Sequence, residues 1–457
     1  MKEKIYFILP NVFQNILISL KNFSANRKRY GGLFNDFSIL FKKNRNLTLN
    51  ELIENQSNRY TVFINQVVER SPYYREQISK IEGYSEIGNI KKLPIIKKET
   101  LRKNIDSIYT ISKNKGIVSK TGGTTGKSLE VLYTPENLQE RIAICDDFRS
   151  RFGYRLGERT AWFSGKNILD KYDIKRNRFW KTDYLYNVRY YSTFHIKDAY
   201  LEYYIKNIQQ YKPKFIVGFP SSILEIAKYG LKNNFKIKKG TIKAIFPTAE
   251  SITPENKFLI EEFFRSKVYD QYASSEGAPF IFECERNNLH LELQSGVFEV
   301  LDPDNKDSSK GKLILTSFTT SGTPLIRYDI GDSIELSNNT CSCGNNNPLV
   351  EKILGREDDY IYSTENGKIN LGNISNTLKD TKGIRKFQVI QNELNKIYIR
   401  IIVDDLSYNK KIEKIFIKNW RDRVGLKMNI DIDYVSDIPV ANSGKYRMVK
   451  NNIKHLI

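Results

Sequence analysis

Residues Ser119–Ser128 read SKTGGTTGKS, and the interpretation of the whole chain starts from this stretch. Glycine lets backbone N–H groups approach an anion closely, and consecutive N–H groups can form a concave anion site. Thr124 and Thr125 add hydroxyl groups, and Lys127 adds a positive charge. The stretch therefore predicts a phosphate-binding loop, entered from a short strand within Lys115–Lys120.

The spacing of this loop excludes the P-loop of nucleoside triphosphatases. That motif needs a glycine five positions before the glycine of its Gly-Lys pair. Five positions before Gly126 stands Thr121, and the nearest glycine is Gly122. The stretch is therefore a phosphate loop of another kind. The competing interpretation of the stretch alone is a Gly/Thr-rich surface turn.

The composition indicates a basic chain of two or more domains. Its 457 residues include 40% hydrophobic residues, enough for a sizeable core. Lys and Arg number 73 against 52 Asp and Glu, which gives a formal net charge of +21. These charges are spread along the chain without long blocks of one sign, so they indicate a general bias rather than a binding tail. No signature of a nucleic-acid-binding module occurs, and no specific nucleic-acid partner is expected.

Four cysteines are too few for a disulfide scaffold in a chain of this length, which favours the reducing cytoplasm. The apolar stretch Ile5–Leu20 is interrupted by Pro10 and by amide side chains, so it is too polar to span a membrane. Its apolar residues recur near helical spacing. We expect a helix whose apolar stripe packs on the body of the protein. The alternative is a basic amphipathic helix in peripheral contact with the inner face of the membrane.

Strands that alternate with helices predict an α/β body. Residues 48–110 are predicted to be helical. Strands are expected at Phe215–Gly218, Ile242–Phe246 and Lys267–Tyr272. Helices are expected at Tyr200–Tyr211, after Pro220 with a serine as N-cap, and after the capping residue Thr253. From Phe298 onward the pattern becomes β-rich.

Gly355–Asp359 is polar and is a candidate linker to a small α+β module. Beyond it we expect strands near Lys386–Gln391, Lys396–Val403 and Asn429–Tyr434, and a helix near Asn409–Val424. The predicted domains are therefore residues 1–354, with 1–110 as the helical leader, and residues 355–457.

Five polar motifs follow one another along the chain. They are Thr121–Lys127, Thr248–Glu250, Tyr272–Glu276, Arg327–Asp332, and Gly355–Asp359 together with Asn442–Lys445. Their order resembles the adenylate-forming superfamily, most closely the phenylacetate–coenzyme A ligases and their capsular-polysaccharide branch. Pro72–Arg75, and Leu93-Pro94 followed by Lys97-Lys98, are typical of that branch.

The resemblance implies a large multi-layer α/β domain with a β-rich subdomain, followed by a small mobile C-terminal lid domain. It implies ATP-dependent activation of a carboxylic acid as acyl-adenylate, with transfer to CoA. A carrier-protein thiol, or an amine or hydroxyl group of a sugar, are alternative acceptors. The expected setting is polysaccharide, capsule or cell-envelope biosynthesis. The alternative function is a non-enzymatic, basic, membrane-associated scaffold of a polysaccharide assembly cluster.

The resemblance also assigns roles to single residues. Nucleotide binding falls to Thr121, Gly122, Gly123, Thr124, Thr125, Gly126, Lys127, Ala249, Glu250, Tyr272, Ser275, Asp332 and Arg356. Among these, Tyr272 would lie against adenine and Asp332 would bind the ribose hydroxyls. Catalysis falls to Lys445, Arg356 and Glu276, with Glu276 as the Mg²⁺ ligand. Asp358 would be the hinge. Ser128 departs from the family, which usually has proline there, and this suggests a more mobile loop exit.

Cys284, His290, Cys341 and Cys343 form a C-x5-H pair followed by a C-x-C pair. Three thiols and an imidazole suit a tetrahedral structural zinc, although the spacing is not that of a standard finger. The alternative is a set of inert buried thiols with a chance histidine.

The sequence does not identify the acid. Its pocket is expected around Phe163–Gly165, Tyr190–His195 and Gly218–Ser221. His195 itself is more simply interpreted as a packed, hydrogen-bonded histidine than as a pocket residue.

Overall fold

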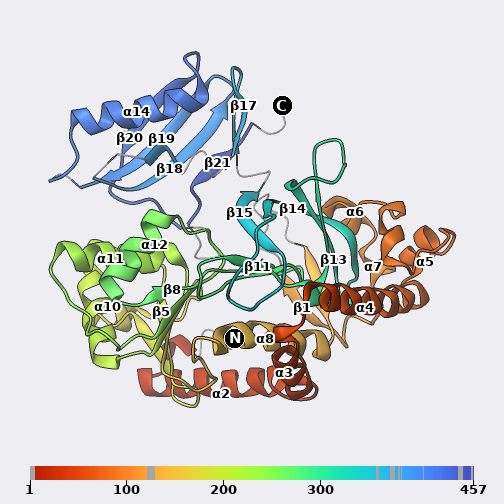
Figure 1. Cartoon of the computed structure of the whole chain (residues 1–457). Coiled ribbons are helices and arrows are strands. Elements are labelled where there is room, and N and C mark those ends of the chain that lie inside the picture. Colours follow the sequence, from red (N-terminus) through yellow and green to blue (C-terminus); the bar gives the residue numbers. More distant parts are fainter. Residues whose placement is uncertain are drawn as a thin grey trace.

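The computed structural model describes the chain apart from residues 1–5, 121–128, 357–359, 371–375, 379–380, 382, 405, 441–445, 454–455 and 457. Two large sheets form the body, and a smaller C-terminal unit stands on one side of it (Figure 1). This unit lies above helices α10 (Asp198–Tyr211), α11 (Pro220–Lys232) and α12 (Pro254–Phe264). Helices α2 (Asn11–Arg29) and α3 (Phe34–Lys43) run along the opposite side of the body.

A six-stranded sheet carries the α/β part of the body. Its strand order is β4-β5-β3-β6-β7-β8, parallel except for the edge strand β4. The strands are β3 (Thr160–Ser164), β4 (Trp180–Asp183), β5 (Val188–Ser192), β6 (Phe215–Gly218), β7 (Ala244–Pro247) and β8 (Lys267–Val268). Helices α10–α12 cover one face, and α3 and α8 (Pro135–Ser150) pack on the other. Every residue of β6 and β7 is buried, as expected for a parallel sheet that is covered on both faces.

A seven-stranded antiparallel sheet forms the β-rich part. Its order is β12-β13-β14-β15-β11-β10-β9. The strands are β9 (Gln271–Ala273), β10 (Phe280–Glu283), β11 (Leu289–Leu291), β12 (Gly296–Leu301), β13 (Lys310–Ser317), β14 (Leu325–Ser337) and β15 (Leu349–Arg356). The helical leader packs against this sheet through one apolar cluster. The helices of the leader that pack here are α4 (Leu49–Arg70), α5 (Pro72–Ile78), α6 (Lys98–Lys103) and α7 (Ile105–Ile108).

A short hairpin joins β1 (Ile117–Lys120) to β2 (Glu130–Tyr133). Its strands pair antiparallel from Ile117↔Tyr133 to Lys120↔Glu130, so they flank the predicted phosphate loop directly. The small helix α9 (Lys171–Lys175) precedes the edge strand β4.

The C-terminal unit is a four-stranded sheet with one covering helix. Its strand order is β20-β19-β18-β21, and a hairpin of two further strands joins its core. The elements are β16 (Tyr360–Ser363), β17 (Gly367–Asn370), β18 (Ile384–Glu393), β19 (Lys396–Val403), α14 (Lys410–Val424), β20 (Asn429–Tyr434) and β21 (Val449–Asn451). Phe387, Phe416 and Trp420 pack edge to face at its centre.

Two local predictions are wrong. The expected strand Lys267–Tyr272 is divided between the two sheets, with β8 in one and β9 in the other, because the chain turns at Tyr269 and Asp270. No serine caps α11, since its N-cap is Phe219 and Pro220 occupies the first turn. Thr253 does cap α12, accepting a hydrogen bond from the Asn256 N–H. The α/β fold class is confirmed, whereas the domain boundary at residue 355 stays a prediction.

The expected orientation of the N-terminal helix is also wrong. Helix α2 packs on the body, but the residues that it buries are Gln14, Asn15, Ser19 and Asn26. Its apolar residues Val12, Phe13, Ile16, Leu17, Leu20 and Phe23 are exposed. Among the described residues, no helix combines the length and apolar character that crossing a membrane requires.

Candidate active site

The carboxyl ends of the parallel strands bring several predicted segments together. Register pairs Phe163 with Gly218 and Gly218 with Pro247, while Ser192 lies opposite Ser164. The residues that follow these strands include the predicted pocket segments and Thr248–Glu250. Ligands commonly bind at this edge of an α/β sheet, so the edge is the candidate acid and nucleotide side of the molecule.

Glu250 connects this edge to the C-terminal unit. Its Oε2 accepts a hydrogen bond from the Ser221 N–H at 3.0 Å, at the start of α11. Its Oε1 accepts one from the Tyr446 N–H at 2.9 Å. Ala249, with φ of +66°, forms the tight turn that aims the carboxylate. This contact holds Tyr446, the residue after the predicted catalytic Lys445, against the body.

Tyr272 and Asp332 meet although they lie on non-adjacent strands of the seven-stranded sheet. The Tyr272 hydroxyl donates a hydrogen bond to Asp332 Oδ2. Asp332 is buried on β14, and its backbone pairs in register with Arg356 on β15. Two predicted nucleotide contacts are thus adjacent, and the backbone of a third is next to them.

The segment around Glu276 is fastened to the hairpin that bears the predicted phosphate loop. The Tyr133 hydroxyl on β2 donates to the Ser275 carbonyl, and Arg141 donates to the Ser274 carbonyl at 2.9 Å. Burial raises the pKa of Tyr133, and the nearby Glu276 carboxylate adds to the rise. Glu276 is 8% exposed, and its N–H donates to the Ser274 hydroxyl at 3.2 Å. The segment that carries Glu276 is therefore tied to β2, the strand that follows the predicted loop.

Several predicted residues lie outside the described part of the chain. They are Thr121, Gly122, Gly123, Thr124, Thr125, Gly126, Lys127, Asp358 and Lys445. The side chain of Arg356 is not described either. Their roles stay predictions. The structure does describe residues next to them, namely Lys120, Tyr446 and the backbone of β15.

Arg327, in the fourth motif, has a structural role. Its guanidinium pairs with Glu299 through two hydrogen bonds of 2.9 and 2.7 Å. It also donates to the Leu93 carbonyl at 2.5 Å, and Ile96 forms backbone hydrogen bonds with β14. Arg327 thus ties the Leu93-Pro94 segment to the strand that carries Asp332.

Sequence reasoning missed Tyr133 and Arg141. The Arg141 guanidinium lies 4.8 Å from the Tyr133 ring and 5.2 Å from that of Phe280, which places it between the hairpin and β10. Neither residue belongs to one of the five motifs, so only the fold reveals their position. His195 hydrogen-bonds through Nδ1 to the Ser192 hydroxyl at 2.9 Å, and burial lowers its pKa.

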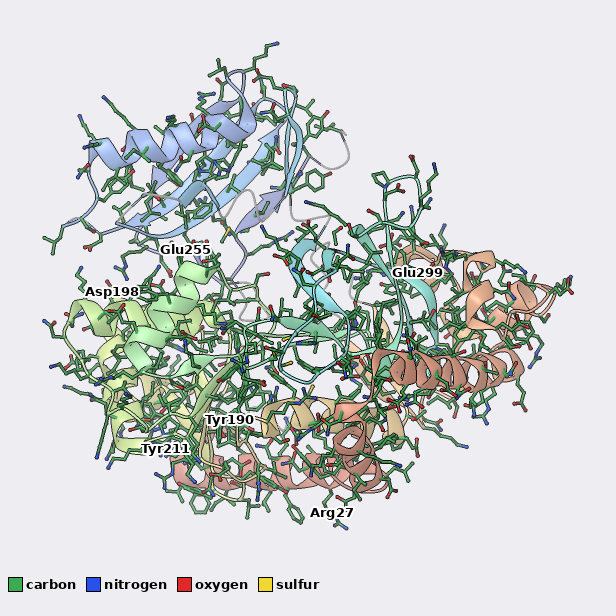
Figure 2. All side chains as sticks on the ribbon, viewed as in Figure 1. Arg27, Tyr190, Asp198, Tyr211, Glu255 and Glu299 are labelled. Atoms are coloured by element: carbon green, nitrogen blue, oxygen red, sulfur yellow. The ribbon has the colours of Figure 1, made fainter. Side chains whose placement is uncertain are left out.

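Charged contacts hold the C-terminal unit on the body. Arg385 on β18 binds the Asp198 carboxylate at the start of α10, with one N–O distance of 2.7 Å, and its carbonyl accepts from Lys228 at 2.8 Å. Lys232 pairs with Asp404 at 2.9 Å. The hydrogen bond from Arg385, followed by its charge, holds the pKa of Asp198 low despite partial burial. Asp198 lies on the side of the body that faces this unit (Figure 2).

The four predicted metal ligands form one cluster. The ligand atoms of Cys284, His290, Cys341 and Cys343 all lie within 4.8 Å of one another. Cys284 Sγ is 3.7 Å from Cys341 Sγ, and Cys343 Sγ is 3.4 Å from His290 Nε2. Donors bound to one tetrahedral zinc lie about 3.5–3.8 Å apart, so these spacings fit. His290 Nδ1 lies 3.2 Å from the Asn347 carbonyl, a contact that leaves Nε2 for a metal.

The comparisons with known proteins agree with this architecture. Residues 361–452 match the family described as the CapK C-terminal domain. The chain is 33% identical over 459 residues to Protein CapK of Staphylococcus aureus, covering 99% of this chain and 100% of that protein. The chain belongs to the CapK family. This CapK-family protein is also 24% identical over 326 residues to phenylacetate-coenzyme A ligase of Thermus thermophilus, covering 67% of this chain and 70% of that one.

A solved structure extends the likeness to the fold of nearly the whole CapK-family chain. It is 2-hydroxyisobutyryl-CoA ligase in the postadenylation state, at a TM-score of 0.72 and 17% identity, covering 91% of this chain and 92% of that one. The same ligase in its thioesterification state gives a TM-score of 0.58. The predicted family resemblance, fold class and enzyme class, an adenylate-forming ligase, are confirmed.

Proposed function

We propose that this CapK-family protein uses ATP to convert a carboxylic acid into an acyl-adenylate and then transfers the acyl group to CoA. The observation that carries the proposal is a set of three contacts that pair the predicted motifs or the residues next to them. Tyr272 meets Asp332, the Glu276 segment is tied to the phosphate-loop hairpin, and Glu250 holds the residue after Lys445. The likeness to named CoA ligases supports the same reaction class.

Each group in this site would act on the nucleotide in a distinct way. The buried Asp332 carboxylate would accept hydrogen bonds from the ribose hydroxyls, and Tyr272 would lie against the base. Glu276 is a buried carboxylate beside the loop hairpin, which suits a Mg²⁺ ligand. Bound Mg²⁺ would supply positive charge to the triphosphate. Lys127, Arg356 and Lys445 would add fixed positive charges where negative charge crowds.

The reaction balances as two displacements. A carboxylate oxygen attacks the α-phosphorus of ATP, and pyrophosphate leaves. The CoA thiolate then attacks the acyl carbonyl carbon, a thioester forms, and AMP leaves. An ammonium group such as that of Lys445 would stabilise the first transition state, where the attacking carboxylate and the phosphate are both negative.

The finer role proposed for the protein is capsule or cell-envelope polysaccharide biosynthesis. The name of the Staphylococcus aureus relative supports it. The acid stays open, and the segments after β3, β5 and β6 would line its pocket.

The test is exchange of radiolabelled pyrophosphate into ATP with a panel of carboxylic acids, followed by CoA-dependent release of AMP. We expect exchange with at least one acid, and losses of about 100-fold or more in Lys445→Ala and Asp332→Ala. Lys410→Ala, an exposed lysine of the same C-terminal unit, is the control and should exchange like the wild type. No exchange with any acid would instead support the scaffold function.

We also infer that the Cys284–His290–Cys341–Cys343 cluster binds a structural zinc ion. The donor set and its spacing support this. Metal analysis of the purified chain should find zinc in about equimolar amount, and His290→Gln should lower that content several-fold. Cys145→Ser, at a cysteine outside the cluster, should retain the wild-type content. Zinc-free wild-type protein with unchanged stability would contradict the inference.

A further inference from the structure

Helix α2 is amphipathic, but its polar side faces the protein. The edge strand β4 explains this orientation, because no described strand pairs with its outer side. Asn15 Oδ1 accepts the Thr182 N–H at 3.1 Å, and Ser19 Oγ accepts the Tyr184 N–H at 2.9 Å. Side chains four residues apart on α2 thus satisfy one backbone donor on β4 and another just after its end. An unpaired edge is thereby covered by a helix.

Buried polar contacts strengthen this attachment. Lys181, with no exposed surface, pairs with Asp173 at 2.6 Å and donates to Asn11 Oδ1 at 3.0 Å and to Gln14 Oε1. Gln14 in turn donates to Asp170 Oδ2 at 2.7 Å. These contacts fix the rotation of α2 about its axis, because buried polar groups must keep their partners. The apolar side of the helix is therefore held outward.

The outward side is a continuous apolar stripe. Val12 is 57% exposed, Phe13 and Leu20 are each 55% exposed, and Phe23 is 46% exposed. Ile16 and Leu17 complete it at helical spacing. Leu33, Ile39 and Leu40 add exposed apolar side chains on and beside α3. Of the twenty-four exposed large hydrophobic residues in the described part of the chain, ten fall within residues 8–40.

The stripe is surrounded by positive charge. Between Glu3 and Asp36 the chain has no acidic residue, and Lys21, Arg27 and Lys28 are exposed on α2. Figure 2 shows Arg27 at the edge of this side of the molecule. An apolar stripe with basic neighbours complements a surface that is negative outside and apolar beneath.

We propose that this α2 face, the six apolar residues from Val12 to Phe23 with Lys21, Arg27 and Lys28, docks on an anionic lipid bilayer. The helix lies in the interface, its apolar side chains enter the acyl boundary, and its cations meet lipid phosphates. The C-terminal unit stands on the opposite side of the body (Figure 1), so docking leaves it free of the lipid. The proposal is independent of the acid and of the acceptor.

Vesicle flotation of the full chain tests the proposal. We expect it to float with vesicles of equal parts phosphatidylglycerol and phosphatidylcholine, and to stay in solution with phosphatidylcholine alone. The triple variant Phe13→Asn, Leu17→Asn, Leu20→Asn should lower the partition coefficient by about 100-fold or more. These side chains are exposed, so the variant should unfold at the wild-type temperature.

A matched control changes the same residue types elsewhere. Phe258→Asn, Leu406→Asn, Leu426→Asn replaces one phenylalanine and two leucines that are 64%, 88% and 82% exposed. It should float like the wild type. Lys21→Gln, Arg27→Gln, Lys28→Gln should weaken binding by about fivefold per charge. Raising the salt from about 0.05 M to about 0.5 M should weaken wild-type binding too.

Four outcomes would overturn the proposal. The first is a wild-type chain that fails to float with anionic vesicles. The second is equal flotation with both lipid compositions, and the third is an equal loss of flotation in the control variant. The fourth is a wild-type dimer in solution that the α2 triple variant dissociates, because the face would then cover a second copy of the chain.

Discussion

The Cys–His cluster and the candidate nucleotide site both gather residues from distant segments, but they are built in different ways. The cluster lies within one sheet, next to β10, on β11 and in the loop before β15, and its donor atoms already lie together. The nucleotide site uses both sheets, the β1–β2 hairpin and the C-terminal unit. Glu250 joins the site to that unit, and the body holds the unit through the partly exposed ion pairs Lys232–Asp404 and Arg385–Asp198. A closed site suits permanent structure, whereas a charged, accessible interface suits contacts that must break and re-form.

Of the changes considered, removing zinc from the cluster should destabilise the protein the most. We expect chelation to destabilise the body by about 4 kcal/mol or more, because three thiolates and an imidazole would lose their common partner. Thermal unfolding with and without chelator measures the change, and added zinc should reverse it. Amide exchange should rise first around Cys341–Asn347 and not in the C-terminal unit. If amide exchange instead rose equally around the cluster and in the C-terminal unit, the cluster would not be stabilising its own surroundings in particular.

Glu250→Gln should affect the interface more than the fold. The amide offers one oxygen where the carboxylate serves the Ser221 and Tyr446 N–H groups with two. Losing one charge-assisted hydrogen bond costs about 1.5–3 kcal/mol, so pyrophosphate exchange should slow by about 10- to 100-fold.

The second half-reaction provides the control for Glu250→Gln. CoA-dependent release of AMP from added acyl-adenylate should stay within about twofold of wild type if the Glu250 contact serves adenylation only. Equal losses in both steps would mean that Glu250 supports the site as a whole.

Arg385→Gln should have a smaller effect. It removes the ion pair with Asp198, whose side chain is 57% exposed. Because solvent screens such a pair, it stabilises the interface by about 1 kcal/mol or less. The rate of pyrophosphate exchange by the wild type should depend on salt concentration. The same rate should depend less on salt in the variant. Arg400→Gln, which breaks the Asp433 pair inside the C-terminal unit, is the matched control and should retain the wild-type salt dependence.

Much of this arrangement could be predicted from the chain, and the failures have physical causes. Strands such as Phe215–Gly218 are continuous apolar runs, and the C-terminal strands and helix alternate regularly, so local pattern was enough. The cluster was predictable because rare residue types fell together. The orientation of α2 was not predictable, because it depends on hydrogen bonds to the backbone of β4 and the residue after it, more than 160 residues away. Tyr133 and Arg141 act through a backbone carbonyl, which leaves no mark in the sequence.

The chain crosses from one sheet to the other at Asp270, and the effect expected at this join depends on pH. Burial, followed by the charge of Glu283, raises the pKa of Asp270 to about 6. The folded protein therefore binds this proton more tightly than the unfolded chain. The stabilising contribution is complete below the unfolded pKa of about 3.9 and is lost as the pH rises through about 6.

Asp270→Asn should remove this pH dependence, since the amide oxygen can still accept the Gln271 N–H and carries no charge. At pH 4 and below, the variant and the wild type should unfold at similar temperatures. Above about pH 6 the variant should be the more stable by about 1–2 kcal/mol, measured by thermal unfolding across this range. Asp304→Asn, in the exposed turn after β12, should match the wild type throughout. If the variant were less stable than the wild type at pH 8, the charged carboxylate of Asp270 would be stabilising the fold instead of destabilising it.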